Sequence, residues 1–151
     1  MEIMGNSLTL AGSEGRITIE VTDYERPSAG NADDANWLTS RLVLQVGPFS
    51  ASFKLSLTTY ELATVLGDLR KHLDSLSGTV TFKSLEEDLS LTFEFATRGA
   101  VFISTVVQPH QWRGTVLRFQ LSSDQTGVAQ VVHQLEAILS RFPIRTGRST
   151  E

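Results

Sequence analysis

A chain of 151 residues with a formal net charge of −4 and no cysteine is long enough for one domain with a sizeable core. The acidic balance argues against nucleic-acid binding, and the absence of cysteine excludes disulfides, thiolate nucleophiles and zinc–thiolate sites. No apolar run approaches the roughly 20 residues of a membrane-spanning helix. We therefore expect a soluble, cytoplasmic, single-domain protein over residues 1–151, with no nucleic-acid or membrane partner.

The first half of the chain predicts four strands. Gly5 and Asn6 interrupt the first of them, and the second alternates cleanly between apolar and polar side chains. Residues 24–36 are rich in Pro, Gly, Asn and Asp, which is typical of a loop. The turn at Gly47 and Pro48 joins two alternating segments into an antiparallel hairpin. The four strands are expected at residues 3–10, 16–22, 37–46 and 49–57.

A capping box marks the start of the first helix. The Thr58 hydroxyl can accept a hydrogen bond from the amide of Glu61, and the Glu61 carboxylate can reach back to the amide of Thr58. The helix is expected to extend to about residue 76, with Gly78 as its stop signal.

The second half of the chain repeats this order of strands followed by a helix. Its strands are expected at residues 80–85, 89–95, 101–107 and 116–121. An acidic turn at residues 86–88 and a loop at residues 109–114 connect them. Asp124 can cap the second helix, which is predicted to end at Phe142 because Pro143 cannot continue the helical hydrogen bonds.

The two strand–helix segments match when the numbering is shifted by 66. Each contains the pattern Phe-x-Leu-Ser, followed by apolar residues on one helical face. The matched apolar positions are Leu62 with Val128, Val65 with Val131, Leu66 with Val132, Leu69 with Leu135, and Leu73 with Leu139. We expect an α+β fold in which about eight mostly antiparallel strands form a bent sheet with two helices on one side. The repeat units would cover residues 1–77 and 78–143, and residues 144–151 would form a frayed tail.

Catalytic and metal-binding signals are sparse. His72 and His133 have no acidic or histidine partner at metal-ligand spacing, so we expect no metal site and no cofactor. His110 lies in a loop, where functional histidines are more frequent. One alternative is therefore a small hydrolase or isomerase with its site near His110 and an acid among residues 86–88. Another is a cup for a small ligand between helices and sheet.

The polar face of the strands carries a few large side chains. Trp37 and Phe102 stand among Ser and Thr residues, with Arg41 and Arg118 on the same predicted face. Tryptophan and arginine are frequent hot-spot residues of protein interfaces. These four residues are candidates for a partner-binding patch, and the competing interpretation is a minor second core.

The segment Asp34-Ala35-Asn36-Trp37-Leu38, with Tyr24 to Pro27 before it and Leu57 to Leu62 after it, resembles the WapI-type bacterial immunity proteins and related uncharacterised bacterial domains. The resemblance implies a non-enzymatic protein that neutralises a cognate toxin by binding it. It adds Asp34 to the candidate partner-binding residues Trp37, Arg41, Phe102 and Arg118. The resemblance thus implies a protein partner such as a toxin domain, and homo-oligomer formation is a further expectation.

Overall fold

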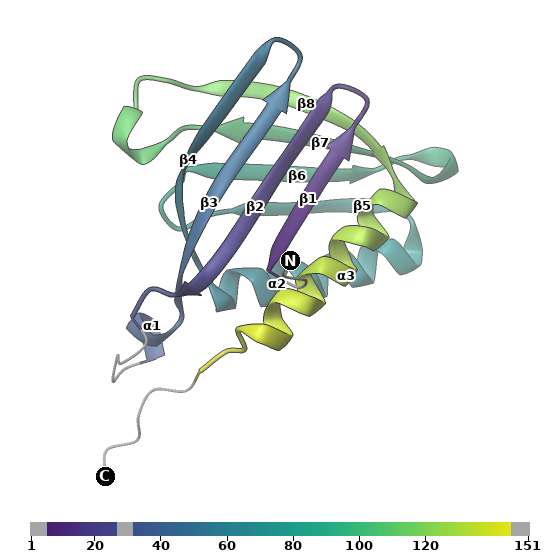
Figure 1. Ribbon diagram of the computed structural model, residues 1–151. Helices are drawn as coiled ribbons and strands as arrows, with labels where there is room; N and C mark the ends of the chain where they lie inside the picture. Colours follow the sequence, from purple (N-terminus) through teal and green to yellow (C-terminus); the bar gives the residue numbers. More distant parts are fainter. Residues whose placement is uncertain (1–5, 27–31, 146–151) are drawn as a thin grey trace, which may run out of the picture.

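The computed structural model describes residues 6–26 and 32–145, in which eight strands form two antiparallel sheets (Figure 1). The first sheet has the order β1-β2-β3-β4. Its strands are β1 (Ser7–Gly12), β2 (Gly15–Tyr24), β3 (Trp37–Val46) and β4 (Phe49–Thr58). The second sheet has the order β5-β6-β7-β8. Its strands are β5 (Gly78–Lys83), β6 (Leu89–Phe95), β7 (Ala100–Val107) and β8 (Leu117–Asp124).

Two long helices complete the fold. They are α2 (Thr59–Ser75), which follows β4, and α3 (Gln125–Arg141), which follows β8. Three short elements lie in the connections: α1 (Ala32–Ala35), η1 (Thr97–Gly99) and η2 (His110–Trp112). Among the residues described, no helix is long and apolar enough to cross a membrane.

The two sheets face each other, and the strands of one run across those of the other (Figure 1). Each strand turns its apolar residues inward, where both sheets and both long helices share one hydrophobic core. This confirms the α+β class, the eight antiparallel strands and the repeat of four strands plus a helix. The strands divide into two sheets instead of continuing as one bent sheet, because α2 intervenes between β4 and β5 and carries the chain to the second layer.

Each long helix packs against the first strand of the other repeat. Helix α3 lies beside β1, α2 lies beside β5, and the helices contact each other on the same side of the sheet pair (Figure 1). Leu69 and Leu135, the matched leucines of the two helical faces, are both buried. The exchange of helices between repeats gives the molecule an approximate two-fold arrangement.

The predicted helix caps are present. The hydroxyl of Thr58 accepts from the amide of Glu61 at 3.2 Å, and the Glu61 carboxylate accepts from the amide of Thr58 at 2.7 Å. Asp124 caps α3 through the amide of Gly127. The end of α2 differs from the expectation, because Leu76 itself takes the left-handed conformation with φ 53° ahead of Gly78.

The start of the expected tail is held in place. Asn36, fully buried, accepts a hydrogen bond from the Arg145 amide and donates one to its carbonyl, at 2.7 and 2.8 Å. The Arg145 guanidinium donates to the carbonyl of Ala35 and lies 3.9 Å from the ring centroid of Tyr24. Arg145 is therefore fixed and not frayed, because it satisfies the polar groups of Asn36. Residues 146–151 lie outside the described residues.

Candidate functional site

The two sheets meet at two corners, and the corner between β1 and β8 is sealed. The amide of Ser13 donates to the carbonyl of Ser122 at 3.3 Å. The Glu14 carboxylate accepts from both the amide and the hydroxyl of Ser122, and these bonds lower the pKa of Glu14. Gly12 lies so close that a Cβ there would come within 2.7 Å of the Ser122 nitrogen. Only glycine permits this approach of the two chains.

The corner between β4 and β5 is open and contains a pocket of about 570 Å³. The pocket lies between the N-terminal half of α2, the strand β5 and the first residue of β3. Its lining includes Trp37, Tyr60, Asp68, Thr81, Lys83 and Leu85. The turn between β5 and β6, residues 84–88, borders this pocket and is longer than the tight turn between β1 and β2, residues 13–14.

A single carboxylate ties this turn to α2. Glu61, already bonded to Thr58 in the capping box, also accepts a hydrogen bond from the backbone amide of Leu85 at 2.7 Å. On the turn itself, the Ser84 hydroxyl accepts from the amides of Asp88 and Leu89. The turn is thus held by its polar groups, while the side chain of Leu85 is 65% exposed.

A second pocket of about 150 Å³ lies on the other side of the same turn. It is bounded by β4, by Glu86 and Asp88, and by the η2 segment with His110 and Trp112. The His110 Nδ1 is 4.0 Å from a Glu86 carboxylate oxygen, so the predicted histidine and one of the predicted acids do come together. This separation exceeds the roughly 2.6–3.2 Å of a direct proton transfer.

Asp88 anchors the loop that carries His110 and Trp112. Its backbone carbonyl accepts from the amide of Gln108 at 2.9 Å, and its buried carboxylate lies 3.7 Å from the Arg113 guanidinium. Burial raises the pKa of Asp88, and the nearby His110 and Arg113 oppose that shift. One carboxylate oxygen of Asp88 is buried with no hydrogen-bond partner.

Large apolar side chains border both pockets. Tyr60 is 42% exposed, Leu85 is 65% exposed and Trp112 is 56% exposed. Trp37, which is half-buried, lines the larger pocket. Apolar groups gathered in this way on a corner rimmed by charged residues are typical of a protein-binding surface. We call Trp37, Tyr60, Leu85 and Trp112 the open-corner surface.

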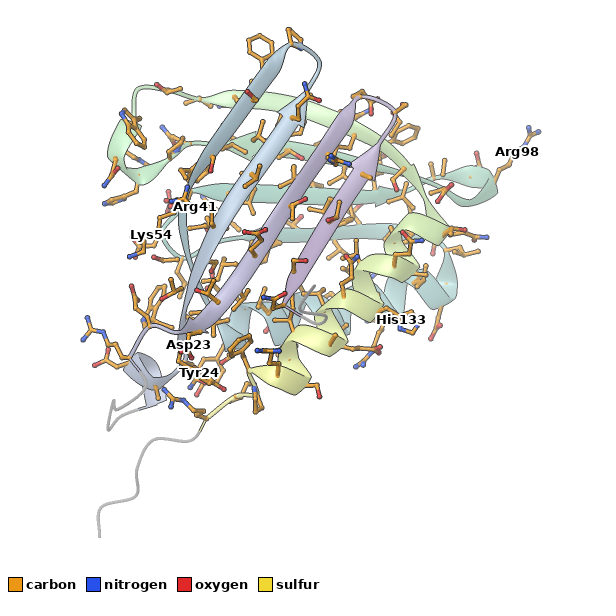
Figure 2. The ribbon with its side chains drawn as sticks, in the orientation of Figure 1. Asp23, Tyr24, Arg41, Lys54, Arg98 and His133 are labelled. Carbon is orange, nitrogen blue, oxygen red and sulfur yellow. The ribbon has the colours of Figure 1, made fainter. Side chains whose placement is uncertain are left out.

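The structure distributes the predicted partner-binding residues over both sheets. Trp37 and Arg41 share the outer face of β3, and the Arg41 guanidinium donates to the Ser52 hydroxyl at 2.9 Å. Figure 2 labels Arg41 on this sheet. Phe102 on β7 and Arg118 on β8 lie on the outer face of the other sheet. Asp34 lies in α1. Of these five residues, only Trp37 borders the open corner.

Tyr60, Leu85 and Trp112 were missed as members of a common surface. Leu85 was assigned to a strand, but β5 ends at Lys83 and the leucine lies in the turn. Its position directly before three acidic residues was the available signal, since an apolar side chain in an acidic turn has no core to enter. Tyr60 and Leu85 line the same pocket because α2 packs against β5 of the other repeat. The alternation of apolar and polar residues does not reveal this packing.

The interior offers little space for a small ligand. The apolar cavity between α2, α3 and the sheets measures about 30 Å³, near the volume that one water molecule occupies. Within the described residues, no cluster of three or more His, Asp or Glu side chains could hold a metal ion.

Comparison with known proteins places this architecture in a family. Residues 8–143 match the family described as the immunity protein WapI-like family. No curated protein matches the chain. The matched region spans both repeats, from β1 to Pro143, which lies two residues after the end of α3, and therefore includes the open-corner surface.

Proposed function

The chain belongs to the immunity protein WapI-like family, and from this premise we propose that it neutralises a toxin protein by binding it, without catalysing a reaction. The proposed partner is the toxin domain, the proposed place of action is the cytoplasm, and the proposed mechanism is occlusion of the toxin's own working surface. Trp37, which the sequence analysis names as a candidate partner-binding residue, belongs to the proposed interface.

The observation that supports this proposal is the open-corner surface. Burying a large apolar side chain that was in water contributes about 1.5–3 kcal/mol. The charged residues around it, such as Asp68 and Lys83, would form a rim that excludes water from the centre of the contact. The surface needs no rearrangement of the core, because α2 and the Glu61 bond to Leu85 already hold its parts.

Co-expression tests this function. The product of the gene directly upstream of this chain's gene is expressed in bacteria with and without the chain, and growth is measured. We expect growth only when the chain is present. Tyr60→Ser should weaken protection, whereas Val43→Ser should not, because Val43 is 40% exposed but lines neither pocket of the open corner. The proposal fails if the chain gives no protection.

The pocket beside His110 supports a second candidate, a hydrolase or isomerase. The supporting observation is that His110, Glu86 and Ser56 line one pocket. An enzyme that inactivates a toxin or its product would lose protection on His110→Ala while still binding the toxin. Under the binding proposal, His110→Ala preserves both protection and binding.

A further inference from the structure

The two repeats differ in the backbone hydrogen bonds at the edges of their sheets. Ser122 on β8 and Ser56 on β4 are equivalent positions, since 122 minus 66 is 56. At Ser122 the outward backbone amide and carbonyl bond to Glu14 and Ser13 of the β1–β2 turn. No hydrogen bond of the described residues reaches the outward amide or carbonyl of Ser56.

The hydrogen bond at the last residue of β4 shows which way the backbone amides and carbonyls of this strand point. The amide of Thr58 donates to Glu61 and therefore points away from β3. Alternate residues of an antiparallel strand point their backbone groups the same way, and the β3–β4 register has no shift. Among the described residues, no hydrogen bond reaches the outward amides and carbonyls of Ser52, Lys54 and Ser56, so they form an unpaired row along the free edge of β4.

We propose that this edge of β4 receives an extended segment of the protein partner, which adds a ninth strand to the structure. The inference rests on the proposed function and names how the partner is held. A polypeptide strand is the occupant that fits, because its amides and carbonyls repeat at the spacing of the unpaired row. The edge lies beside the smaller pocket, which Lys54 and Ser56 line, so an inward side chain of the segment would enter next to Trp112.

Charge selects a partner segment over a second copy of this chain. Lys54 lies directly opposite Arg41 in the β3–β4 pair, so two basic side chains stand next to each other at this edge (Figure 2). On its other side, Arg41 lies opposite Glu20 of β2. Two β4 edges paired about Lys54 would bring like charges together, which is destabilising. A segment with an acidic residue opposite Lys54 would instead balance these charges, even though Glu25 already lies 3.6 Å from the Lys54 ammonium.

Amide hydrogen exchange tests the inference directly. The probe is the product of the gene directly upstream, mixed with the full chain, and exchange is followed residue by residue. We expect the amides of Ser52, Lys54 and Ser56 to slow at least about tenfold in the complex. The amide of Ser122, already bonded to Glu14, should change little.

The repeat supplies a matched pair of variants. Lys54→Pro removes one outward amide from the β4 edge, and Gln120→Pro does the same at the equivalent position of β8. We expect Lys54→Pro to weaken toxin binding at least about tenfold and Gln120→Pro to leave it unchanged. If Lys54→Pro does not fold, the exchange experiment on the unaltered chain still decides.

Three outcomes would overturn the inference, and they are distinguishable. If the complex forms and the three β4 amides exchange as before, the edge is not used, although the proposed function stands. If these amides are already protected in a dimer of the free chain, a second copy occupies the edge. If no complex forms with the toxin domain, the proposed function fails as well.

Discussion

Arg70 of α2 and Glu136 of α3 are 66 residues apart in the sequence, occupy equivalent positions of the two repeats, and form an ion pair. A contact between equivalent positions places both residues next to the approximate two-fold axis. The pair lowers the pKa of Glu136, chiefly through the hydrogen bond from Arg70. The two repeats therefore differ in charge where they meet, which lets one helix attract the other.

The matched leucines of the two helices should be equally important for stability. Leu69→Ala and Leu135→Ala each leave a cavity in the shared core, and each should cost roughly 2–5 kcal/mol of unfolding free energy. Denaturant unfolding monitored by circular dichroism measures the cost. Leu85→Ala is the control, since an exposed leucine should change stability by less than about 0.5 kcal/mol. A loss below about 1 kcal/mol at both core sites would contradict the assigned helical faces.

Two glycine substitutions should change the stability of the protein in opposite directions. Gly12→Ala places a methyl group 2.7 Å from the Ser122 nitrogen and should destabilise the sealed corner by about 1–3 kcal/mol. Gly67→Ala meets open space in the middle of α2 and should stabilise the protein by up to about 1 kcal/mol. Thermal or urea unfolding of the two variants distinguishes them. Equal effects would mean that the β1–β8 approach is looser than observed.

The hydrogen bonds of Glu14 at the sealed corner should make the stability of the protein depend on pH. The pKa of Glu14 is lowered in the folded chain, so its contribution is present above the usual value of 4.5 and is lost as the pH falls through the lowered value. Glu14→Gln should therefore reduce the urea midpoint near pH 7 and have less effect at an acidic pH below the lowered pKa of Glu14. Glu94→Gln, an exposed carboxylate on β6, is the control. The same deficit at both pH values would show that the carboxylate charge is not involved.

Trp37 should matter more for binding than for folding. It stands on the outer face of β3 and lines the larger pocket. Trp37→Ala should change unfolding free energy by under about 1 kcal/mol and weaken toxin binding at least about tenfold. Val43→Ala, on the same face of β3, should leave both unchanged. If Trp37→Ala unfolds the protein, the tryptophan belongs to the core.

Much of the fold could be predicted because its signals are local. The alternation along β3, the capping box at Thr58 and the apolar stripe through Leu69 each depend on neighbours within a few residues. The shift of 66 then revealed the repeat. What could not be predicted is the division into two sheets, because alternation shows that a strand has a buried face but not which layer covers it.

The candidate site was harder to predict for the same reason. Trp37 was identified from its type and its strand face, but Phe102 and Arg118 share only the property of facing outward and lie on the other sheet. Tyr60 and Leu85 line the same pocket. The hydrogen bond from the Leu85 amide to Glu61 that holds the turn there joins residues 24 apart in the sequence. Arg145 was expected in a frayed tail because its partner, Asn36, is 109 residues away.

The account depends most on direct binding of the toxin, and titration calorimetry measures it. Purified chain is titrated into the product of the gene directly upstream of its own, and the toxic activity of that product is assayed in the same samples. We predict a saturable complex of one chain to one toxin domain, with activity falling in proportion to the fraction of toxin bound. Protection of cells by a chain that shows no binding heat and forms no complex with the toxin would contradict the account.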